Sequence, residues 1–174
     1  LPILEGMGLR VGDERPYEVK PEGRRSTWIY DIGIVSDFHP DLQTEAARTT
    51  FQDAFTNVWS GELENDRLGA LVLRAGLTGR EVSLLRALVK YLRQAGATFS
   101  DRYLQQALTG NPAVAKLLVE LFGARFDPER HHLGAADRLV VEIERAIDDI
   151  ASLDQDRILR NCLAVVRATV RTNY

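Results

Sequence analysis

The chain has 174 residues, of which 45% are hydrophobic and 27% are charged, and its formal net charge is −3. A chain of this length buries roughly 70% of its unfolded surface, enough for one substantial core or for a small domain with a helical extension. The slight negative charge gives no general attraction to nucleic acid or anionic lipid, and no apolar run reaches the roughly 20 residues that span a bilayer, so we expect a soluble protein with no nucleic-acid or membrane partner.

The first part of the chain is typical of a helix end that leads into a β-hairpin. Residues 11–19 and 27–35 have the composition of strands, and Pro21 and Gly23 between them favour a turn. Pro16 lacks the N–H that a sheet ladder needs, which predicts that the first strand lies at an edge or bulges there.

The second predicted strand has two different faces. One face carries Trp28, Tyr30, Ile32 and Ile34, and the other carries Ile29, Asp31, Gly33 and Val35. We therefore expect the sheet to be covered on one side and only partly on the other. Asp31 lies among apolar neighbours, so it either faces water or pairs with a buried partner, and it is a candidate interaction residue.

After residue 40 the period of the apolar residues changes from 2 to 3.6, and the rest of the chain is predicted to be helical. The first of these helices follows Asp41 as its N-cap. Further helices are expected over residues 66–75 and 79–95, from 100 to a break at 111–112, from that break to Gly123, and over residues 135–151 and 155–171. The last two are expected to pair as an antiparallel hairpin.

The clearest local signal is a capping box formed by Thr78 and Glu81 at the start of the helix over residues 79–95. Its apolar stripe consists of Val82, Leu85, Val89 and Leu92. The opposite, charged face is expected to carry Arg86, Lys90 and Arg93.

Several residues resemble parts of known sites, but a structural role explains each of them better. Glycines 6, 8 and 12 resemble a loosened dinucleotide-binding motif, yet the strand and helix that this motif requires stand in the reverse order. The other candidates are His131 and His132 as metal ligands, His39 before Pro40, and the carboxylates of Asp148, Asp149, Asp154 and Asp156. Adjacent residues point in different directions and no zinc-ligand spacing is present, so we assign these residues no chemistry.

The single cysteine, Cys162, lies within an apolar helical stripe. A thiol at such a position usually packs as a small hydrophobic group, and no paired histidine motif is nearby to activate it. With one cysteine and no leader-peptide pattern at the start, we expect a reducing, cytoplasmic setting.

Four arginines are predicted to gather along one face of the last helix: Arg157, Arg160, Arg167 and Arg171. Three roles remain open for this face: a solvated surface, a docking face for an acidic neighbouring domain, and a site for an anion or nucleic acid.

Residues 77–86 resemble the opening of the helix-turn-helix module of LuxR-type regulators. A recognition helix carries polar and basic side chains toward the bases. The later helix that would serve, residues 114–122, offers only Lys116 and is otherwise apolar or acidic. A DNA-binding regulator is therefore the weakest of the alternatives.

Several stretches along nearly the whole chain are informative in combination. They are Leu1-Pro-Ile-Leu4 with Gly8-Leu-Arg-Val11, Asp13-Glu-Arg-Pro-Tyr-Glu-Val19, Val58-Trp-Ser-Gly61 with Glu64-Asn-Asp66, Leu73-Arg-Ala-Gly-Leu77, Lys90-Tyr-Leu-Arg93, Ala124-Arg-Phe-Asp-Pro128, and Asp156-Arg-Ile-Leu-Arg160 with Arg167-Ala-Thr-Val-Arg-Thr-Asn-Tyr174. In this joint order they resemble the large bacterial NAD-specific glutamate dehydrogenases.

The resemblance implies an α+β fold that is mainly α. Residues 1–61 would form part of an ACT-like (ferredoxin-like) α+β unit, and residues 62–174 a helical bundle that leads toward the catalytic domain. That domain, with its substrate lysine, its acid and base groups and its Rossmann NAD domain, is expected after residue 174. The resemblance therefore implies no catalytic, cofactor-binding or metal-binding residue within this chain.

By the same resemblance, the parent protein would deaminate L-glutamate oxidatively to 2-oxoglutarate and ammonium with NAD. The chain would then be a noncatalytic regulatory or assembly segment of that enzyme. Its implied partners are the catalytic domain of the same polypeptide, other copies in a homo-oligomer, and an amino-acid effector. The alternative from a different class is a free-standing helical interaction module.

Overall fold

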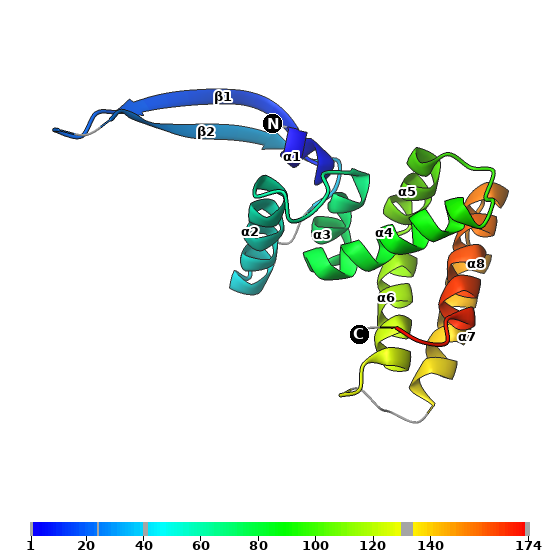
Figure 1. Cartoon of the computed structure of the whole chain (residues 1–174). Coiled ribbons are helices and arrows are strands. Elements are labelled where there is room, and N and C mark those ends of the chain that lie inside the picture. Colours follow the sequence, from blue (N-terminus) through cyan, green and yellow to red (C-terminus); the bar gives the residue numbers. More distant parts are fainter. Residues whose placement is uncertain (1, 24, 40–41, 130–133, 173–174) are drawn as a thin grey trace.

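The computed structural model describes residues 2–23, 25–39, 42–129 and 134–172. In Figure 1 a two-stranded ribbon projects from a body made of helices. The elements are α1 (Pro2–Gly6), β1 (Arg10–Val19), β2 (Thr27–Val35), α2 (Glu45–Trp59), the 3₁₀ turn η1 (Arg67–Gly69), α3 (Ala70–Ala75), α4 (Gly79–Gln94), α5 (Asp101–Gly110), α6 (Pro112–Phe126), α7 (Ala135–Asp148) and α8 (Leu153–Ala168). The prediction of a hairpin followed by helices is confirmed.

The ribbon is an antiparallel pair in which Pro16 lies opposite Tyr30. The irregularity in its register falls between Val11 and Asp13, so the strand bulges at Gly12 and not at Pro16. With only two strands in the described sheet, each strand has a free edge, and an edge accommodates the missing N–H of Pro16.

Large apolar side chains are exposed on both faces of the ribbon, which corrects the expectation that one face is covered. Trp28 and Tyr30 on one face are 51% and 53% exposed, and Ile29 on the other is 56% exposed. The physical reason is visible in Figure 1, where the helices pack on one another and the ribbon points away from them.

The base of the ribbon is anchored in the helical body by close backbone packing. Met7 and Leu9 are buried in the connection between α1 and β1. Gly8 has a φ of +80°, and a Cβ added there would lie 3.0 Å from the Cβ of Ala70. An added Cβ at Gly69 would likewise lie 3.0 Å from the carbonyl oxygen of Gly6. The glycines at the start of the chain thus serve a turn and a close approach between α1 and η1.

The start of α2 differs from the prediction. Asp41 lies outside the described residues, and the N-cap is Thr44, whose side chain accepts a hydrogen bond from the backbone N–H of Ala47. A threonine at this position satisfies one of the free donors of the first turn, as aspartate would. Phe51 and Phe55 of this helix pack against the core.

The helix ends around α3 and α4 follow the sequence signals closely. Asp66 caps η1, and α3 ends at Gly76, which has a left-handed φ of 68°. The reciprocal hydrogen bonds of the capping box between Thr78 and Glu81 are both present. Local side-chain chemistry therefore determines where these helices begin and end.

Helix α6 lies at the centre of the bundle and packs against α3, α4, α5, α7 and α8. Its residues Val114, Ala115, Leu118, Val119 and Leu121 are all buried. Most of the surface of α6 is thus covered by other helices, whereas a recognition helix needs a free face for the DNA groove, so the structure gives no support to the helix-turn-helix interpretation. The predicted end at Gly123 is also wrong, because the hydrogen bonding continues through this buried glycine to Phe126.

Helices α7 and α8 pair through a short connection, as predicted. Both are shorter at their C-terminal ends than the apolar pattern indicated, since α7 ends at Asp148 and α8 at Ala168. Arg125 of α6 donates hydrogen bonds to the backbone carbonyls of Val166 and, at 3.2 Å, of Thr169. This guanidinium satisfies carbonyls that the last turn of α8 leaves free.

Candidate functional site

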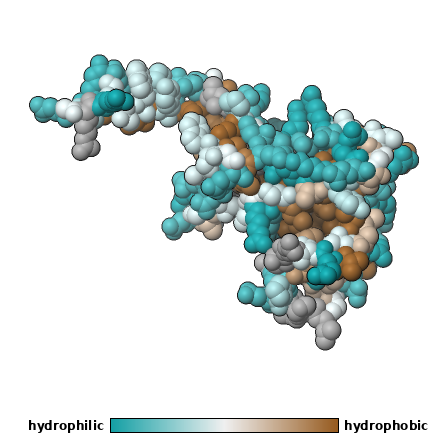
Figure 2. All heavy atoms as spheres, viewed as in Figure 1, coloured by the Kyte–Doolittle hydropathy of each residue, from teal (hydrophilic) through white to brown (hydrophobic). Residues whose placement is uncertain are grey.

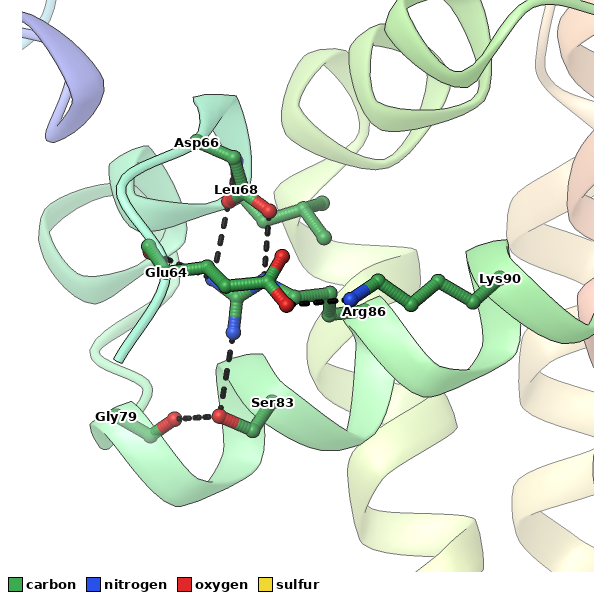
Figure 3. Close-up of polar contacts among 7 residues, drawn as sticks. All are labelled: Glu64, Asp66, Leu68, Gly79, Ser83, Arg86 and Lys90. Carbon is green, nitrogen blue, oxygen red and sulfur yellow. Dashed lines mark hydrogen bonds and ion pairs between the residues drawn. The ribbon is translucent and has the colours of Figure 1, made fainter. Parts of the chain in front are cut away.

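The most extensive polar cluster in the described chain surrounds Arg86 on α4 (Figure 3). Its guanidinium donates to both carboxylate oxygens of Asp66, with N–O distances of 2.6 and 3.0 Å. It also donates to the backbone carbonyl of Glu64 and to the hydroxyl of Ser83, each at 3.2 Å. The Arg86 side chain is 8% exposed and that of Asp66 is 16% exposed, so the pair is largely withdrawn from water.

Each member of this cluster has a second partner that holds it in place. Asp66 accepts the backbone N–H of Leu68 at 3.1 Å, and the hydroxyl of Ser83 donates to the carbonyl of Gly79 at 3.0 Å. Lys90 forms an ion pair with Glu64 at the exposed rim. The hydrogen bond from Lys90 is the largest cause that lowers the pKa of the Glu64 carboxyl.

The Arg86 cluster holds residues 64–68 against α4 through hydrogen bonds and an ion pair. A buried ion pair requires good geometry and further hydrogen bonds to offset the loss of hydration, and both are present here. No buried side-chain nitrogen or oxygen in the described residues lacks a hydrogen-bond partner. The hydrogen bonds of the cluster are therefore those of a structural joint between residues 64–68 and α4.

The prediction that Arg86 lies on the exposed face of its helix is wrong. Arg86 follows Val82 by four residues and precedes Val89 by three, so it lies at the border of the apolar stripe. That spacing was the signal available in the sequence. What the sequence could not show is that Asp66, twenty residues earlier in the chain, would lie beside it.

The predicted arginine face is divided between several roles. Arg160 pairs with Asp148 at 2.6 Å and with Asp156 at 3.0 Å, and Arg167 lies 3.5 Å from Glu144. Hydrogen bonds to Asp148 and Asp156 raise the pKa of Arg160 above its already high ordinary value. Within the described chain these two arginines therefore join α8 to α7.

The other two arginines are placed differently from each other. Arg157 is exposed on α8. Arg171 lies beyond the end of α8 at Ala168, so it does not continue the helical face. It lines an open groove of about 810 Å³ between the C-terminal ends of α4 and α8, together with Tyr91 and Val165. Figure 2 shows hydrophobic side chains gathered in a hollow below α4.

The remaining sequence candidates lie apart from one another. His131 and His132 fall outside the described residues, and His39 is exposed in the connection before α2. Asp149 follows α7 as its C-cap, and Asp154 lies in the first turn of α8. Asp31 is exposed on the ribbon opposite Arg15. Among the residues that the structure describes, no group of three or more His, Cys, Asp or Glu side chains could hold a metal ion.

Cys162 is fully buried in the core, as the sequence predicted. Burial raises the pKa of its thiol from 9.0 to about 12.

We expect iodoacetamide at pH 8 to leave Cys162 of the folded chain unmodified and to alkylate it after unfolding in urea, as intact-mass spectrometry will show. Because the folded-state pKa is the higher one, this thiol stabilises the fold below about pH 9 and that contribution is lost as the pH rises toward 12. Rapid alkylation of the folded chain would contradict the burial.

No helix in the described part of the chain is both long and apolar enough to cross a membrane.

Two family models match the chain. One is described as glutamate dehydrogenase, ACT3 domain, and matches residues 1–47. The other is described as glutamate dehydrogenase, helical motif 3, and matches residues 63–128. The first contains the ribbon and the second contains the Arg86 cluster and helices α3 to α6.

The chain is also similar to curated proteins named NAD-specific glutamate dehydrogenase. The identity is 38% for the protein of Halomonas elongata, 42% for that of Mycobacterium tuberculosis and 39% for that of Pseudomonas aeruginosa. Each alignment covers 100% of this chain but only 11% of the relative.

Proposed function

The chain matches a segment of the large NAD-specific glutamate dehydrogenases, and on that premise we propose that it is a noncatalytic segment that serves the regulation or assembly of such an enzyme. The parent activity that we propose is the NAD-dependent oxidative deamination of L-glutamate to 2-oxoglutarate and ammonium. NAD would be bound elsewhere in the polypeptide. The family match favours this interpretation over a free-standing interaction module.

The observation that carries the proposal is the exposed ribbon within the region that matches the ACT3 domain. Trp28, Ile29 and Tyr30 are each more than half exposed, although they are large and apolar. Such side chains on an unpaired strand edge are typical of surfaces that another protein segment covers. We propose that the covering segments come from the same polypeptide or from another copy in a homo-oligomer.

Two finer points also belong to the proposal. The division into an ACT-like unit over residues 1–61 and a helical domain over residues 62–174 stays a prediction. It is supported by the two matches at residues 1–47 and 63–128. An amino-acid effector of the parent enzyme is the further partner that an ACT-like region suggests.

The test has one arm on the chain and one on the full-length enzyme. The 174-residue chain is expected to form no NADH from glutamate and NAD, and turnover like that of an intact enzyme would contradict the noncatalytic role. In the full-length enzyme, Trp28→Asp is expected to reduce the assembled fraction measured by light scattering. Leu153→Asp is the matched control, because Leu153 is 83% exposed at the start of α8. An equal effect of both variants, or of neither, would contradict an assembly role of the ribbon.

A further inference from the structure

A second pocket, separate from the Arg86 cluster, lies at the base of the ribbon. It has a volume of about 380 Å³ and is lined by α1, by the connection after β2, by η1 and α3, and by α5. Its lining residues come from both matched regions, since Glu5, Gly6, Gly8 and Asp37 fall within residues 1–47 and the rest within residues 63–128. The pocket therefore straddles the junction between the ribbon region and the helical body.

Two helical segments each direct a polar face at this pocket. Arg67, Ala70 and Arg74 line it from η1 and α3 at spacings of three and four residues. Arg102, Gln106 and Thr109 line it from α5 at spacings of four and three. These spacings place each set on one side of its segment. Three guanidinium groups, from η1, α3 and α5, are thus brought to a single pocket.

The three arginines differ in how far their charge is already compensated. Arg74 pairs with Asp37 at 2.7 Å, and its guanidinium lies 4.5 Å from the centre of the Phe38 ring. Arg67 and Arg102 form no ion pair or side-chain hydrogen bond with any residue that the structure describes. The one acidic lining residue that is likewise unpaired among the described residues is Glu5. The pocket consequently holds one uncompensated positive charge.

We propose that this pocket binds a compact dianion, either a phosphate group or a pair of carboxylates, through Arg67 and Arg102. A guanidinium presents its N–H donors in a planar fork that matches the oxygens of phosphate and carboxylate. Two such forks and the side-chain amide of Gln106 line a volume suited to a small molecule. Because the ligand contacts both matched regions, its binding stabilises the junction between them.

The test is calorimetric titration of the 174-residue chain with inorganic phosphate and, separately, with succinate, at constant ionic strength set by sodium chloride. We expect saturable binding of at least one of these probes and a rise in the unfolding temperature on its addition. Arg67→Gln and Arg102→Gln are each expected to weaken binding about tenfold or more, as the loss of a charge-assisted hydrogen bond predicts. Both side chains are exposed, so the variants should keep their helical circular dichroism.

The matched control is Arg157→Gln, which removes an exposed arginine on α8, a helix that contributes no residue to the lining of this pocket. It is expected to bind the probes as the unmodified chain does. Saturation by phosphate alone identifies a phosphate-bearing ligand, and saturation by succinate alone identifies a dicarboxylate. No saturable binding of either probe, or equal weakening by Arg157→Gln, would overturn the proposal. Neither outcome depends on the activity of the parent enzyme.

Discussion

Replacing Arg86 with methionine is expected to lower the free energy of unfolding by about 3 kcal/mol, measured by urea denaturation of the chain. The substitution keeps much of the side-chain volume but leaves the largely buried carboxylate of Asp66 without its bidentate partner. Breaking one side of a buried ion pair typically costs about 3–5 kcal/mol. Because Asp66 remains 16% exposed, we expect the lower end of this range.

Lys90→Met provides the matched control for this variant. Lys90 of the same helix forms an ion pair with Glu64, which lies before η1, but the two side chains are 56% and 58% exposed. Exposed pairs contribute about 1 kcal/mol or less, so this variant should unfold close to the unmodified chain. In the double variant Asp66→Asn with Arg86→Met, part of the stability should return, because the unpaired charge is gone. Equal losses of unfolding free energy in Arg86→Met and Lys90→Met would contradict the structural role of the Arg86 cluster.

Leu118→Ala is expected to destabilise the chain by about 3 kcal/mol, because Leu118 is fully buried in the central helix α6. The loss combines the transfer of the removed atoms with the cavity that remains, and comparable leucines give about 2–5 kcal/mol. Lys116→Ala on the same helix is the control and should change stability by about 0.5 kcal/mol or less, since Lys116 is exposed. Thermal and urea unfolding of both variants provide the measurement.

The comparison of these two variants also tests the helix-turn-helix interpretation. A recognition helix would tolerate changes on its free face and would depend on its basic residue for binding. A small effect of Leu118→Ala would mean that α6 is not enclosed as described. A loss of stability confined to Leu118→Ala would agree with the packing of α6 against five other helices.

Features that depend on neighbouring residues in the chain could be predicted from the sequence. The capping box at Thr78 and Glu81 and the helix end at Gly76 involve donors and acceptors within a few residues of one another. The strand β2 has its predicted bounds because its alternating pattern and the turn before it are local. The burial of Cys162 followed from its position in an apolar stripe.

Features that depend on distant parts of the chain could not be predicted in this way. The exposure of both ribbon faces reflects where the helices pack, which the alternation of side chains within a strand does not encode. The burial of Arg86 depends on Asp66, and the pairing of Arg160 depends on Asp148 in another helix. The pocket at the base of the ribbon likewise joins arginines from η1 and α5 that the sequence separates by 35 positions, from Arg67 to Arg102.

The base and the outer part of the ribbon differ in what limits their substitutions during evolution. Side chains at its base, such as Met7 and Leu9, are buried within this chain, so an exchange there requires compensating exchanges in the residues that surround them. Side chains farther out, such as Trp28 and Tyr30, are largely exposed in this structure. Substitutions at Trp28 and Tyr30 are expected to accompany substitutions in the protein segment that we propose covers them. The two ends of one hairpin thus diverge under separate constraints.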